Sequence, residues 1–152
     1  MRTALASILL LATSAGFAAD DGAVAKELKS LAGSWKGVAA EEGGKAIPKG
    51  ELLSITFTLE ADGKAAVRVN DGEAFQTLSV IDPTKSPKTI DIEYLGGLYK
   101  GQKQYGIYKL EGDRWTVFST PAGGRPEDRP KGFDSKTAKG TLVVWERVKD
   151  KK

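Results

Sequence analysis

The 152-residue chain contains no cysteine and no histidine. These absences exclude a cysteine nucleophile, a Ser-His-Asp triad, a histidine acid–base pair and ordinary zinc, copper or haem ligation. Disulfide bonds are excluded as well, so a packed core must hold the fold together. The net charge is only +3, without the clustered basic residues of a nucleic-acid-binding surface. We therefore predict a protein that is not an enzyme and has no metal, no cofactor and no nucleic-acid partner.

Long apolar runs are also scarce, and the clearest one lies at the N-terminus. Arg2 is followed by an apolar stretch over residues 4–12 and then by small residues up to Ala18. This order is typical of a secretory signal peptide, and the stretch is much shorter than the about 20 apolar residues that span a bilayer. We predict a signal peptide over residues 1–18 and a single domain over residues 19–152. The protein should be exported, periplasmic or extracellular, without stable membrane insertion after signal cleavage.

A short helix is predicted over residues 20–32. Val24, Leu28 and Leu31 recur at helical spacing and form one apolar stripe. Gly33 follows at the position where a residue with positive φ commonly ends a helix. The helical pattern stops there.

The rest of the chain is typical of β-strands separated by turns. Residues 53–60 alternate between apolar and polar side chains, as expected for a strand with one buried face. Strands are predicted over residues 34–41, 53–60, 65–70, 74–81, 89–95, 103–110, 114–120 and 141–148. The pattern fits an antiparallel meander that closes into a barrel or packs as a sandwich, and closure would remove the exposed edges. We predict an all-β fold, a single eight-stranded antiparallel barrel preceded by the short N-terminal helix.

The segment between the last two predicted strands, residues 121–140, is long and rich in glycine, proline and charge. Loops of this length are usually functional lids or disordered segments. Because its charges have mixed signs, we interpret it as a solvated segment, with contact to an acidic partner as the alternative.

Two features at opposite ends of the domain suggest one structural unit. Gly33-Ser34-Trp35 begins the first strand directly after the helix, and Arg147 lies on the last strand. The combination resembles the Gly-x-Trp signature of lipocalins and related calycins, in which an Arg of the last strand stacks on the Trp. The resemblance implies a lipocalin-like barrel with Gly33, Trp35 and Arg147 as its structural signature.

Further similarity extends over most of the predicted domain. The stretches are LAGSWKGVAAEEGGKAIP at 31–48, DPTKSPKTIDI at 82–92, GIYKLEGD at 106–113 and RPKGFDS at 129–135. Together they resemble a planctomycete-type family of small exported domains of unknown function. No activity is attached to that family, so the resemblance implies a type of domain and not a reaction.

Aromatic residues on apolar strand faces are the candidate ligand-binding residues. They are Phe57, Tyr94, Tyr105 and Trp115. Each shares its strand face with aliphatic residues, so alternation predicts that all of them point into the barrel. An eight-stranded barrel is either filled by side chains or holds one small ligand. We predict an exported, non-enzymatic domain that binds a small apolar or amphipathic ligand, or an extracytoplasmic protein. The alternative is a structural or protein-interaction domain with a filled core and no small-molecule ligand.

Overall fold

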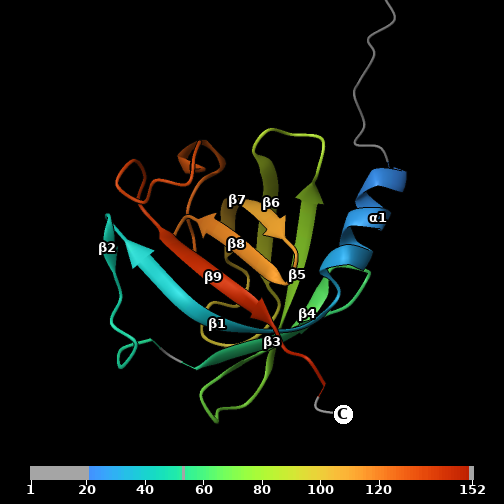
Figure 1. Ribbon diagram of the computed structural model, residues 1–152, viewed down its shortest axis with the longest axis horizontal. Helices are drawn as coiled ribbons and strands as arrows, with labels where there is room; N and C mark the ends of the chain where they lie inside the picture. Colours follow the sequence, from blue (N-terminus) through green and yellow to red (C-terminus); the bar gives the residue numbers. More distant parts are fainter. Residues whose placement is uncertain (1–20, 53, 151–152) are drawn as a thin grey trace, which may run out of the picture.

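The computed structural model describes residues 21–52 and 54–150. Within them, one α-helix is followed by strands that are mostly joined by short connections (Figure 1). The elements are α1 (Asp21–Leu31), β1 (Gly33–Glu42), β2 (Lys45–Ala46), β3 (Ile55–Leu59), β4 (Lys64–Val69), β5 (Phe75–Asp82), β6 (Lys88–Tyr94), β7 (Lys103–Glu111), β8 (Arg114–Ser119), a 3₁₀ turn (Pro126–Asp128) and β9 (Thr141–Arg147). The predicted signal peptide and its cleavage after Ala18 lie outside the described residues.

Eight of the strands form a closed antiparallel barrel. The order is β1-β3-β4-β5-β6-β7-β8-β9, and β9 pairs back with β1. Trp35 of β1 is thereby flanked in register by Phe57 of β3 and Arg147 of β9. Closure gives both terminal strands of the meander a partner, so neither presents a free edge along its paired length. The predicted all-β barrel, its strand number and its N-terminal helix are confirmed.

The observed strands depart from the predicted ones around the first hairpin. The predicted loop after residue 41 contains the two-residue strand β2, which pairs with the end of β1. The predicted strand over residues 53–60 is observed as the shorter β3, and Leu53 lies outside the described residues. A register shift between Gly37 and Ala39 also interrupts the pairing of β1 with β9. Such a bulge exchanges inward and outward positions along the rest of the strand.

Helix α1 closes one end of the barrel. Leu28 and Leu31 are buried and belong to the same core cluster as the inward-facing residues of the strands. Glu27 accepts hydrogen bonds from Lys88 Nζ at 2.6 Å and from Tyr108 OH at 3.3 Å. Burial, together with the Glu27 carboxylate, raises the pKa of the Tyr108 hydroxyl, which keeps it protonated as a donor. The helix is therefore attached by apolar packing and by polar contacts. No helix in the described part of the chain is long and apolar enough to cross a membrane.

Residues 121–140 lie along the outer wall of the barrel, and we call this segment the strap (Figure 1, orange). Pro130 and Ser135 of the strap are fully buried. Ile107 of β7 and Phe118 of β8 are paired in register and equally buried, although they do not belong to the interior core cluster. The strap therefore covers a second, smaller apolar contact on the outside of the barrel.

Arg129 fastens the middle of the strap. Its Nη1 donates to the carbonyl oxygens of Ile90 and Gly106 at 3.2 and 2.8 Å, and its Nη2 pairs with Asp91 Oδ1 at 2.7 Å. The guanidinium also lies 5.5 Å from the centre of the Tyr105 ring. The interpretation of this segment as simply solvated is therefore wrong at its centre, where it is anchored to β6 and β7.

Candidate functional site

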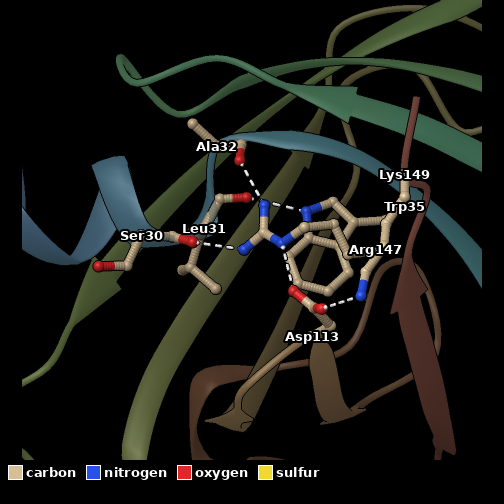
Figure 2. Close-up of polar contacts among 7 residues, drawn as sticks. All are labelled: Ser30, Leu31, Ala32, Trp35, Asp113, Arg147 and Lys149. Carbon is tan, nitrogen blue, oxygen red and sulfur yellow. Dashed lines mark hydrogen bonds and ion pairs between the residues drawn. The ribbon is translucent and has the colours of Figure 1, made fainter. Parts of the chain in front are cut away.

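The floor of the barrel is built around Trp35 and Arg147 (Figure 2). The guanidinium carbon of Arg147 lies 4.3 Å from the centre of the Trp35 ring, well within the range of a cation–π contact. The two residues are paired in register across β1 and β9, and the Trp35 side chain is completely buried. The predicted stacking of these two residues is confirmed.

Arg147 also connects α1 to the barrel. Its Nη1 and Nη2 donate to the carbonyl oxygens of Ala32 and Ser30, both at 2.7 Å, and its Nε donates to Asp113 Oδ1 at 3.2 Å (Figure 2). The last carbonyl groups of a helix lack partners within it and carry its negative dipole end. Hydrogen bonding to Lys149, and to a smaller degree the Arg147 charge, lowers the pKa of the Asp113 carboxyl. The guanidinium fork thus satisfies the end of α1 while it stacks on Trp35.

Position 33 requires glycine for two reasons. The φ angle of Gly33 is +125°, which residues with a side chain rarely adopt. A Cβ atom at this position would also lie 3.0 Å from Nη1 of Arg147. Gly33, Trp35 and Arg147 therefore form one unit at the junction of helix and barrel.

The half of the interior next to α1, called here the closed half, is filled. Its largest side chains are at most 4% exposed: Trp35, Leu59, Ile81, Ile90, Tyr108 and Trp115. Phe57 packs edge-to-face on Trp115 and on Trp145, with ring centres 5.6 and 4.9 Å apart. Trp115 in turn lies 5.4 Å from Trp35. These aromatic rings come from the neighbouring strands β8, β9, β1 and β3 and form a continuous layer on that side of the interior.

The opposite half, called the open half, is lined by small or polar side chains together with aliphatic ones. The register places small or polar residues on the inner face beyond the aromatic layer, namely Ala40, Thr77, Ser79, Gly106, Ser119 and Val143, and the larger Ile55, Val67 and Ile92 face inward with them. At the rim Phe75 and Tyr94 also face inward and are only partly buried. Because the wall of the barrel is continuous, solvent reaches these rim residues through the end opposite α1. In the described strands, no charged side chain faces inward between the aromatic layer and the rim, where Glu42 accepts a hydrogen bond from Thr141.

Tyr94 is held at the rim by a polar chain and by other rings. Its hydroxyl donates to Gln104 Oε1 at 2.9 Å, and Gln104 Nε2 donates to the carbonyl oxygen of Thr120 at 3.0 Å. The Tyr94 ring lies 6.1 Å from Phe75 and 5.5 Å from Tyr99, measured between ring centres. Burial, and then the neighbouring Tyr99, raises the pKa of Tyr94. The rim is therefore aromatic on this side, and its hydroxyl stays neutral.

The two most deeply buried indoles differ in their hydrogen bonding. Trp35 Nε1 donates to the carbonyl oxygen of Leu31 at 2.8 Å. Trp115 is 3% exposed, and its Nε1 is buried without an acceptor among the residues that the structure describes. An unpaired buried donor costs about 1–3 kcal/mol, so such groups usually meet water or a ligand. Trp115 Nε1 is thus a point of the interior where an acceptor from outside the chain would be stabilised.

Tyr105 does not belong with the other predicted site residues. It pairs with Asp91, whereas the next pair, Gly106 with Ile90, faces the interior. Tyr105 therefore lies on the outer wall beneath Arg129 of the strap. The prediction of an inward orientation is wrong for Tyr105, and it holds for Phe57, Tyr94 and Trp115.

Sequence reasoning missed the polar residues that line the open half. Thr77 and Ser79 face inward on β5, and Ser119 does so on β8. A signal was available on β5, since Thr77 and Ser79 alternate on the same strand face as Phe75 and Ile81. These residues are at most 9% exposed, and their inward hydroxyl groups make the inner face of this half partly polar, without charge.

Two hollows of about 500 and 780 Å³ border the strap on the outside of the barrel. The larger is lined in part by Arg125 and Arg129. Arg125 pairs with Glu127 and Asp128, and Arg129 pairs with Asp91. Each of these two arginines is already paired with an acidic side chain. Neither arginine therefore offers an unpaired positive charge to an anion in the hollow. The described residues also contain no group of acidic side chains that could hold a metal ion.

Comparisons with protein-family models, curated proteins and solved structures find no match to this chain. The resemblance to the planctomycete-type family and to the calycins therefore stays a prediction.

Proposed function

We propose that this chain is an exported, non-enzymatic, lipocalin-like domain that binds one small apolar or amphipathic ligand in the open half of its barrel. The observation that carries the proposal is the contrast between the two halves of the interior. The largest side chains gather in the closed half, whereas small and hydroxyl-bearing side chains face inward beside aliphatic ones in the open half, and the aromatic residues at its rim are partly exposed. An eight-stranded barrel can hold one small ligand where its inward side chains are small.

The energetics of such binding follow from the residues of the open half. An apolar ligand would remove the partly exposed faces of Phe57, Trp145 and Tyr94 from water, at about 25 cal/mol per Å² of apolar area buried. The floor is already ordered by the stack of Arg147 on Trp35 and by the helix contacts of that arginine. A site that is ordered before the ligand arrives loses little conformational entropy on binding.

The second candidate is a structural or protein-interaction domain with a filled core. It is favoured by the aromatic layer of Phe57, Trp115 and Trp145, whose rings pack on one another within the core. In that case the rim aromatics would contact an extracytoplasmic protein and no small ligand would enter. A ligand titration separates the two candidates.

Titration of the purified protein with fatty acids, quinones and hopanoid-like lipids is expected to give a saturable change in tryptophan fluorescence with at least one of them. Ser79→Leu should weaken that binding about tenfold or more, because it fills the open half with a larger side chain. Tyr105→Phe is the matched control and should leave the affinity unchanged, since this ring lies on the outer wall. The absence of any saturable response across the panel would contradict the proposed ligand site and favour the second candidate.

Export is tested separately by sequencing the N-terminus of protein recovered from the periplasm or medium. The order of basic, apolar and small residues before Ala19 leads us to expect a mature chain that starts at or near Ala19. Recovery of the protein from the cytosol with Met1 intact would contradict this prediction.

A further inference from the structure

We infer that the ligand of the open half is an uncharged molecule with a hydrogen-bond acceptor, such as a ketone or ester oxygen, which accepts from Trp115 Nε1. This inference rests on the proposed function and specifies the chemistry and orientation of its ligand. The acceptor would lie at the aromatic layer and the apolar part of the ligand would extend toward the rim.

The first support is the position of the unpaired donor. Trp115 faces the interior at the start of β8, and its ring packs edge-to-face against Phe57 of β3. The next inward residues of β8 are Val117 and Ser119, and Ser119 faces Gly106 across the strand pair. All three residues are small, so on this wall little side-chain volume separates the Trp115 ring from the rim. A ligand that enters from the rim can therefore approach the layer that contains this donor.

The second support is the absence of inward charge in the described strands of the open half. The nearest cations, Lys88 and Arg147, lie in the closed half beneath the aromatic layer. Lys88 is paired with Glu27, and Arg147 is occupied by the end of α1 and by Asp113. An ionised carboxylate in the open half would lose its hydration without gaining a counter-ion, which is strongly unfavourable. A neutral acceptor loses less hydration and satisfies the indole donor.

The third support is the contrast with Trp35. Both indoles are buried in the same aromatic layer, but Trp35 Nε1 is satisfied by the Leu31 carbonyl. The chain thus provides an internal acceptor for one indole and leaves the other without one among the described residues. A hydrogen bond from the ligand to Trp115 would remove this deficit.

The test compares three seven-carbon probes, methyl pentyl ketone, heptane and heptanoate, by calorimetric or competition titration. The wild-type protein should bind the ketone at least tenfold more tightly than heptanoate. In Trp115→Phe, which removes the donor and keeps an aromatic ring, the preference for ketone over heptane should fall about fivefold. Tyr105→Phe, the control on the outer wall, should retain the wild-type preference. The ketone and heptane affinities are compared within each variant, so a change that weakens the binding of both probes equally leaves their ratio unchanged.

A second measurement avoids dependence on a variant. The chain has three tryptophans, so proton–nitrogen NMR spectra of the wild-type protein should contain three indole N–H signals. The Trp115 signal should shift downfield with the ketone and show no downfield shift with heptane.

The possible outcomes separate the inference from the proposed function. An unchanged ketone preference in Trp115→Phe, or an indole signal that responds equally to both neutral probes, would overturn the assigned hydrogen bond and leave the ligand site in place. Tighter binding of heptanoate than of the ketone would overturn the neutral class. No saturable binding of any probe to the wild-type protein, here and in the lipid panel, would overturn the proposed function together with the inference.

Discussion

Replacement of Arg147 with alanine is expected to lower the free energy of unfolding by about 3 kcal/mol, because it removes charge-assisted hydrogen bonds and the stack on Trp35 together. The two carbonyl oxygens that it binds, those of Ser30 and Ala32, lie at the end of α1. The ion pair with Asp113 adds little, since that carboxyl is half-exposed and screened by water. Urea denaturation, monitored by tryptophan fluorescence, measures this loss.

Two further variants show which part of the Arg147 interaction matters. Arg147→Lys keeps the charge but loses the planar fork, so it should recover only part of the stability. Asp113→Asn removes only the exposed ion pairs of Asp113 with Arg147 and Lys149, which water screens, so it should cost far less than Arg147→Ala. If Arg147→Ala were no more destabilising than Asp113→Asn, the floor could not depend on the helix contacts and the stack.

The parts of the fold that were predictable depend on local signals. The apolar stripe of α1 and the glycine after it indicate where the helix ends and which face it buries. Trp35 and Arg147 are far apart in sequence, and they were brought together by resemblance to known barrels rather than by any local pattern. The structure adds the reason for the glycine, because a Cβ at Gly33 would crowd the same guanidinium.

The error at Tyr105 has a physical origin in the strap. On a strand with one buried face, apolar residues mark the inside. On β7, Ile107 is buried on the outer face and Tyr108 on the inner face, so alternation cannot distinguish them. Every residue of β8 from Trp115 to Ser119 is buried as well, because the core covers its inner face and the strap covers its outer face. The composition of residues 121–140 indicates a long loop, but not the wall on which it lies.

The open half could not be predicted because its character depends on how the barrel closes. Thr77 and Ser79 are ordinary polar residues of a strand until the register turns them inward beside Tyr94 and Ile92. The unpaired Trp115 donor is likewise a property of three-dimensional packing, since nothing in its sequence neighbourhood shows that an acceptor is lacking. Residue size and hydrogen-bond satisfaction, which decide between a filled and a partly filled barrel, become visible only once the register is known.

The contact between the strap and the outer wall predicts a large effect at Phe118. This side chain is completely buried on the outer face of β8, paired with Ile107, so Phe118→Ala should lower the free energy of unfolding by about 3–5 kcal/mol. The same change should release the strap from the barrel more often, because the strap then covers a cavity instead of a ring. Urea denaturation measures the first effect, and limited proteolysis with trypsin measures the second.

The proteolysis experiment is specific because of the sequence of the strap. Both of its arginines precede proline, where trypsin does not cut, so cleavage should occur after Lys131, Lys136 or Lys139. Phe133→Ala is the matched control. Phe133 is a strap residue that is only partly buried, with Lys109 Nζ 5.2 Å from its ring centre. Its replacement should lower the free energy of unfolding much less than that of Phe118. If Phe118→Ala were as mild as Phe133→Ala and left cleavage at these lysines unchanged, the strap would be a dispensable loop. A large loss with rapid cleavage means instead that residues 121–140 form part of the folded core, on the side of the wall opposite to the ligand.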